Sequence, residues 1–160
     1  MLRRSFLIAL GGLGLSAYAA QSKTLPQKDF RTADLVGGSF AMQTSQLALT
    51  RTRNPALINF ANAEISEQTQ VAMALGAAPG SAPLRPDHAA LLRQLEALSS
   101  GAAFDRMYVQ GQIRGHRELL ALNSSYLRTG SNAHEQQVAQ MSLPIIQQHL
   151  AVLSSLREMA

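Results

Sequence analysis

The strongest constraint on the fold is a helical apolar repeat in the C-terminal half of the chain. Apolar and glycine residues recur there at steps of three and four, at Phe104, Tyr108, Gly111, Gly115, Leu119, Leu122 and Tyr126. This spacing places them on one face of an α-helix of about six turns. A helix with so long an apolar face needs other helices or a sheet to cover it. No segment shows the alternation typical of a strand, so an all-α fold is favoured.

Two long helices are predicted before this repeat. The first spans about 32–52, with an expected inward stripe at Val36, Phe40, Gln43 and Leu47. The second begins where Asn54 precedes Pro55, a capping residue followed by proline at the first helical position. It runs to about position 75. Because at most four residues connect the two helices, we expect them to be antiparallel.

A short helix and a last long helix complete the prediction. After a loop rich in proline and glycine at 76–86, Asp87 is expected to cap the short helix, with His88 exposed beside it. Asn132 and Glu135 form a capping box for the last helix. Its predicted stripe is Val138, Ser142, Ile145, His149, Val152 and Leu156. The fold class is therefore an antiparallel four-helix bundle with one short extra helix between the two helix pairs.

The first 19 residues have the features of an export signal. Arg3 and Arg4 precede an uncharged apolar run at 6–15, and small residues in an A-x-A pattern follow at 17–19. The run is shorter than the roughly 20 residues that span a bilayer, so we expect cleavage after Ala19 and no lasting anchor. The adjacent arginines leave two export routes open, twin-arginine and Sec.

The predicted mature chain is a single domain. Residues 20–30 are polar, contain Pro26 and are expected to be a flexible leader, and residues 31–158 form one helical domain. The expected location is the periplasm or cell envelope, and the expected state is a monomer without a membrane span. The partner is an unknown protein or another component of the envelope.

Composition excludes several classes of function. The chain contains no cysteine, which excludes disulfides, thiolate metal sites and cysteine nucleophiles. Without the signal, 12 of the 14 basic residues remain against 10 acidic ones, and they are scattered singly. Neither nucleic acid nor an anionic membrane is therefore an expected partner. No nucleophile elbow, Walker loop or dinucleotide glycine pattern occurs, so no catalytic residue and no bound cofactor is assigned.

Several phrases resemble a known family. They are Ser100-Gly101-Ala102-Ala103-Phe104-Asp105-Arg106-Met107-Tyr108, His116 eleven residues after Asp105, Leu143-Pro144 with His149 five residues after the proline, and Asn54-Pro55 followed by Phe60-Ala61. In order and spacing they resemble the exported bacterial family known as domain of unknown function 4142, over about 34–156. The resemblance implies a ferritin-like four-helix bundle of the periplasm or outer envelope, with no established activity.

This chain departs from that family's pattern at candidate metal ligands. Where the family usually has an acidic residue followed by histidine, the chain has Glu67 and Gln68. Acidic residues that the family carries in the first helix are replaced by Ala41 and Gln43. Both departures weaken the expectation of a metal role drawn from relatives.

Four polar residues lie on or beside faces that should be buried, namely Glu64, Gln68, His116 and His149. In an antiparallel bundle they can meet in one polar cluster, and buried polar groups need partners. One interpretation is a metal site of Glu64, His116 and His149, suited to iron or zinc. The other is a hydrogen-bonded layer with neutral histidines that fixes helix register. The Glu-x-x-His pattern of di-iron bundles is absent from the sequence.

Two functional hypotheses follow from these residues. The favoured one is a non-catalytic envelope or stress-related protein that binds a partner or has a structural role. The alternative is a metal-binding or redox protein that uses the Glu/His cluster in the core. No enzymatic role is predicted.

Overall fold

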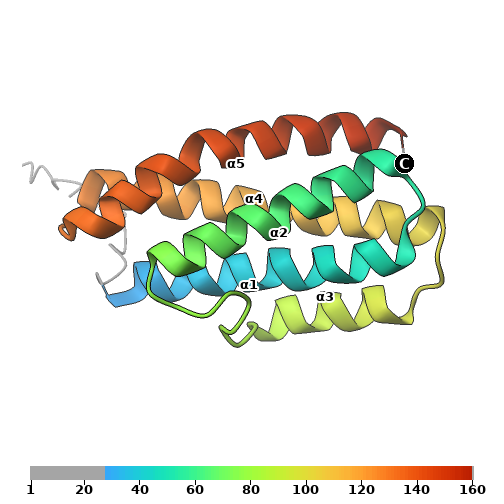
Figure 1. The fold of residues 1–160 in the computed structure, drawn as a ribbon, viewed down its shortest axis with the longest axis horizontal. Helices are drawn as coiled ribbons and strands as arrows, with labels where there is room; N and C mark the ends of the chain where they lie inside the picture. The colour runs from blue at the N-terminus through green and yellow to red at the C-terminus, as the bar shows by residue number, and fades with distance from the viewer. Residues whose placement is uncertain (1–27, 160) are drawn as a thin grey trace, which may run out of the picture.

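The computed structural model describes residues 28–159, which form five α-helices and no strand. The helices are α1 (Lys28–Arg51), α2 (Pro55–Ala74), α3 (Pro86–Ala97), α4 (Ala102–Thr129) and α5 (Ala133–Met159). The four long helices run side by side along the long axis, and α3 lies alongside α1 (Figure 1). The predicted all-α fold is confirmed. The predicted signal and residues 20–27 of the predicted leader lie outside the described residues.

The local signals at the start of α2 act as predicted. Asn54 is the N-cap, and its side-chain oxygen accepts a hydrogen bond from the backbone nitrogen of Ala56 at 3.0 Å. Pro55 occupies the first turn, where no intrahelical donor is required. The short connection of residues 52–54 lets α2 turn back along α1.

The first helix begins earlier than predicted. Its first residue is Lys28, so residues 28–30 of the predicted leader are helical. Phe30 is only 1% exposed and stacks on Tyr126 of α4, with 4.0 Å between the ring centroids. Burial of this ring against α4 gives the additional turn a tertiary contact that the local sequence does not reveal.

The start of α3 also differs from the prediction. Arg85 is at the N-cap position without a side-chain capping bond, Pro86 opens the helix, and Asp87 lies in the first turn instead of capping it. His88 is 4% exposed and not an exposed neighbour, because its ring stacks on Phe40 of α1 at a centroid distance of 4.3 Å. The packing of α3 onto α1 buries this side chain.

The apolar repeat in α4 is confirmed, while two other stripes are shifted. Every member of the repeat is buried except Leu122, which is partly buried. In α5, Val152 is 40% exposed and Leu153 is buried in its place. In α1, Gln43 and Leu47 are only partly buried. This helix packs against α2, α3 and α4, so its buried residues cover a wider arc than the predicted stripe.

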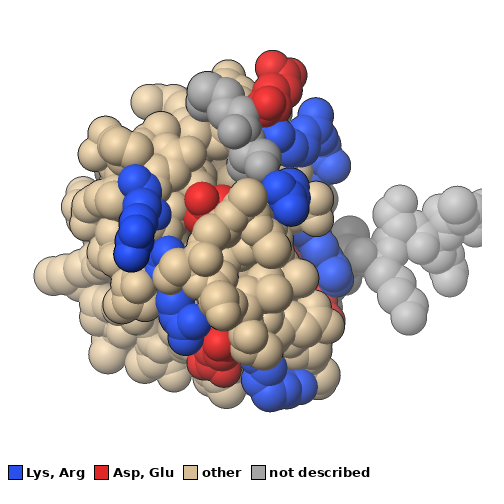
Figure 2. Space-filling model, turned by 90° about the vertical axis from the view of Figure 1, so that its right-hand side faces the viewer, with Lys and Arg blue, Asp and Glu red and all other residues tan. Residues whose placement is uncertain are grey.

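Charges are dispersed on the face of the molecule seen in Figure 2. Lys and Arg side chains lie at several places on this face, with acidic side chains among them. Within the described chain, no helix combines the length and the apolar character required to cross a bilayer.

Candidate metal site

Three buried side chains from three helices meet at one point in the core. Glu64 lies on α2, His116 on α4 and His149 on α5, and they are 0%, 1% and 6% exposed. Oε2 of Glu64 is 3.0 Å from Nε2 of His116 and 2.8 Å from Nδ1 of His149. The two nitrogens are 3.1 Å apart. One oxygen and two nitrogens thus form a nearly equilateral triangle.

Helical spacing brings each of these groups inward. Glu64 continues the buried face of α2 one turn after Phe60 and Ala61. The ring of Phe60 lies 5.1 Å from that of His149 and 6.0 Å from that of His116, between centroids. An apolar wall therefore covers one side of the triangle, which lowers the local dielectric and strengthens the electrostatic interactions.

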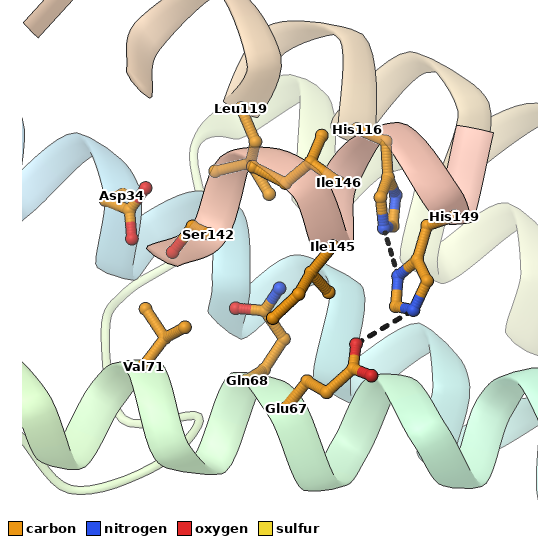
Figure 3. Close-up of a pocket in the computed structure, with 10 residues that line it drawn as sticks. All are labelled: Asp34, Glu67, Gln68, Val71, His116, Leu119, Ser142, Ile145, Ile146 and His149. Atoms are coloured by element: carbon orange, nitrogen blue, oxygen red, sulfur yellow. Dashed lines mark hydrogen bonds and ion pairs between the residues drawn. The ribbon is translucent and has the colours of Figure 1, made fainter. Parts of the chain in front are cut away.

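Each of the three side chains also has a partner at its other polar atom, through a hydrogen bond for Glu64 and His116 and through an ion-pair contact for His149. Nδ1–H of His116 donates to the backbone oxygen of Gln112 at 2.8 Å, and the amide of Gln68 donates to Oε1 of Glu64 at 3.0 Å. Nε2 of His149 lies 2.8 Å from Oε2 of Glu67 in an ion-pair contact. Figure 3 shows the His149 ring between His116 and Glu67. Ligating histidines in metalloproteins are usually oriented in this way, by a carbonyl or carboxylate behind the ring.

The electrostatics of the cluster are those of buried opposite charges. Burial alone raises the pKa of Glu64, but the charges and hydrogen bonds of His116 and His149 outweigh it and lower that pKa to about 2. Burial lowers the pKa of His116, yet the Glu64 carboxylate beside it gives a net rise. The Glu64 carboxylate thus favours the charged form of His116, whereas the hydrogen-bonded-layer interpretation expects neutral histidines.

Protons can also satisfy the triangle, because both histidines can donate to Oε2 of Glu64. If both facing nitrogens carry protons, both donate to the Glu64 carboxylate, although the two donors lie only 3.1 Å apart. If Nε2 of His116 lacks its proton, its lone pair faces the Glu64 carboxylate at 3.0 Å. A cation at the centre can accept all three lone pairs at once. The arrangement is therefore chemically suited to a positively charged centre.

The size of the triangle fits one face of an octahedral metal ion. Adjacent ligands around an octahedral ion with bonds of about 2.1 Å are about 3.0 Å apart, against about 3.4 Å for a tetrahedral ion. The observed separations are 2.8, 3.0 and 3.1 Å. The same separations are typical of hydrogen bonds, and around a bound ion the two histidines and one carboxylate would constitute a facial triad.

Comparison with known families assigns the chain. The family described as a domain of unknown function (DUF4142) matches residues 15–156. The chain belongs to this family. The match includes Glu64, His116 and His149. No curated protein and no solved structure matches the chain. Membership in DUF4142 agrees with the helical fold and assigns no activity.

The structure brings together all four residues of the polar cluster predicted for this DUF4142 protein. Gln68 contacts Glu64 as a hydrogen-bond donor and not as a member of the triangle. Glu67, which is part of a departure from the family pattern and was not predicted to join the cluster, lies one helical turn after Glu64 and contacts His149. The i, i+3 spacing of two glutamates was the signal available for it.

Two further polar contacts were not predicted. Asp34 is 3% exposed, and Asn123 donates to its Oδ1 at 2.8 Å. Burial raises the pKa of Asp34 to about 6 in spite of this hydrogen bond. Gln112, whose backbone oxygen holds His116, donates from its side chain to α1, including Oγ1 of Thr44 at 2.9 Å. The partners in these contacts are far apart in sequence, so spacing within one helix does not reveal them.

In a second group of one histidine and two carboxylates, the carboxylates form ion pairs with arginines. Asp87, His88 and Glu118 approach one another where α3 meets α4. Arg85 contacts all three, and Arg114 forms ion pairs with both carboxylates. Two arginines neutralise two carboxylates here, so no excess negative charge remains to bind a metal ion.

Proposed function

We propose that this DUF4142 protein binds one transition-metal ion at Glu64, His116 and His149 in the core of a ferritin-like four-helix bundle. The observation that carries the proposal is the orientation of each ligand from behind. Gln68 holds Glu64, the carbonyl of Gln112 holds His116, and Glu67 contacts His149. A set of ligands oriented in this way resembles a pre-formed metal site more closely than an incidental ion pair.

The donor set indicates which ions fit best. Imidazole nitrogens and a carboxylate suit iron(II) and zinc. Of these, iron(II) matches the octahedral spacing of the triangle better, and a facial triad leaves up to three positions for water or a small ligand. Binding is proposed here, and no catalytic residue or reaction is assigned.

We also propose that the protein works outside the cytoplasm. Support comes from the sequence at 1–19, where two arginines, an apolar run and an A-x-A pattern follow one another. The predicted export signal and the buried triad occur in the same chain, so we favour a metal-binding protein of the periplasm or cell envelope. It replaces the partner-binding role as our favoured function because the triad is pre-oriented.

Elemental analysis tests the metal site directly. The protein is purified from the periplasm without a polyhistidine tag, and bound metal is measured by mass spectrometry. We expect close to one ion per chain, with loss of the ion in His116→Gln and in His149→Gln. The matched control is His88→Gln, another buried histidine outside the triad. Metal-free protein that also gains no thermal stability from added iron(II) or zinc would contradict the proposal.

A further inference from the structure

We infer that metal ions reach the triad through the groove between α2 and α5, and that Glu67 is the carboxylate that receives them on the way. This inference rests on the proposed function, because it concerns access to the same site. It adds a route and a transit residue to the three ligands.

Two adjoining cavities form the route. An outer groove of about 90 Å³ lies between α2 and α5, with Ala74, Val138 and Met141 among its lining residues. An inner cavity of about 20 Å³ is lined by both histidines of the triad. The two share their lining at Glu67, Val71, Ser142 and Ile145. Figure 3 shows Glu67 and Ile145 next to His149, and Val71 and Ser142 farther from the triad histidines, toward Asp34.

The position of Glu67 suits a transit ligand. Its side chain is 30% exposed, while its Oε2 is buried and lies 2.8 Å from Nε2 of His149. This contact lacks the alignment of a hydrogen bond, so Oε2 retains its capacity to bind a cation. Glu67 is also the only charged residue among those lining the outer groove. A cation in the groove therefore meets one carboxylate, which also contacts the triad.

A competing route on the opposite side is less suited to a cation. A larger groove of about 530 Å³ lies against α1 and α4 and also reaches Leu119, which lines the inner cavity. Arg85 lines that groove, forming an ion pair with Glu118. The guanidinium repels a metal ion, and its partner carboxylate is already neutralised. Charge therefore favours the groove between α2 and α5.

The experiment measures the rates of metal binding and release with Co²⁺ as the probe, followed by its visible absorbance in stopped flow. Ser142→Leu places an apolar side chain where the two cavities meet. A blocked route raises the barrier equally for entry and exit, so both rates should fall by about tenfold, which corresponds to about 1.4 kcal/mol. The dissociation constant should stay the same. The matched control Ser125→Leu obstructs the competing groove and should leave both rates unchanged.

Glu67→Gln separates transit from positioning. If Glu67 carries ions inward, the binding rate falls in this variant, since an amide attracts a cation far less than a carboxylate does. If Glu67 only orients His149, affinity is lost through faster release while the binding rate is unchanged. That second result, together with unchanged rates in Ser142→Leu, would overturn the route and leave the site intact. Slower binding in Ser125→Leu alone would overturn the route as well. Wild-type protein that binds no Co²⁺ would overturn both the route and the site.

Discussion

At the scale of single residues, the core contains ionisable side chains among its apolar ones. Glu64 and His116 compensate each other, whereas Asp34 has only a neutral amide, Asn123, at its Oδ1. A carboxylate buried beside a neutral donor is more costly than one beside a cation, and its pKa rises as a result. Asp34 is therefore a buried group whose titration should be visible in the stability of the fold.

Asp34→Asn should make stability less dependent on pH. The pKa of Asp34 is raised from 3.8 to about 6 in the folded protein, so the folded state binds more protons than the unfolded state between these values. The contribution of Asp34 is thus present below about pH 4 and is lost as pH rises through about 6. An amide at position 34 can still accept the hydrogen bond from Asn123 and avoids this loss.

Urea unfolding of metal-free protein at pH 4.5 and 7.5 measures the effect. We expect the stability of Asp34→Asn relative to wild type to increase by about 2 kcal/mol between the two pH values. A difference that is the same at both pH values would show that Asp34 titrates normally in the folded state.

His88→Ala should destabilise the fold although His88 lies next to a helix start. The ring is 4% exposed and stacks on Phe40, so truncation removes a buried contact and costs about 1–3 kcal/mol. Leu119→Ala, in the apolar repeat of α4, should cost about 2–5 kcal/mol. Thermal melts of both variants give the comparison. A change below about 0.5 kcal/mol in His88→Ala would be typical of a surface residue and would contradict the packing of α3.

At the scale of elements, α1 is the helix whose role was least evident from sequence. It packs against three other helices, and polar side chains on it find partners on α4. Ser45 forms a hydrogen bond with the hydroxyl of Tyr108 at 2.8 Å, and Asp34 is bonded to Asn123. Two glycines, Gly37 and Gly38, lie in its buried section beside side chains of α4 and α2. Small and polar residues thus occupy buried positions of α1 outside the predicted stripe.

A matched pair of glycine substitutions tests these helix contacts. In Gly115→Ala the new methyl group would lie 3.4 Å from the Phe40 ring, an ordinary contact, so the higher helix propensity of alanine should stabilise by about 0.5–1 kcal/mol. In Gly38→Ala the methyl group would collide with the amide oxygen of Gln68. We expect Gln68 to move, which weakens its bond to Glu64 and lowers metal affinity.

Melting temperature and metal affinity are measured for both variants. Gly115→Ala should melt higher with unchanged affinity, and Gly38→Ala should bind metal more weakly with its fold retained. Equal affinities in the two variants would show that Gln68 does not orient Glu64.

At the scale of the whole molecule, the helices were predictable and the contacts between them were only partly so. The cap at Asn54 and the repeat of α4 are local signals, and both are confirmed. The burial of Phe30 depends on Tyr126, and that of His88 depends on Phe40, so neither was visible in the residues around them. The residues of the polar cluster could be predicted from sequence because they are polar residues on or beside otherwise apolar helix faces. Their convergence required the three-dimensional arrangement.

Processing at the N-terminus is a further prediction for the whole molecule. We expect the exported product to begin near Ala20, because the apolar run at 6–15 is too short to span a bilayer and an A-x-A pattern follows it. N-terminal sequencing of protein recovered from the periplasm measures this. Intact Met1 in the membrane fraction would contradict it.

The three triad residues belong to distant parts of the sequence, and this has a consequence for chain entropy. Glu64 is 52 residues from His116, which is 33 residues from His149. An ion bound by all three closes two long loops in the chain, as a pair of crosslinks would. Crosslinks across long loops oppose unfolding most, because they restrict the unfolded ensemble. In a protein without cysteine, such an ion would stabilise the folded chain as disulfides stabilise many exported proteins.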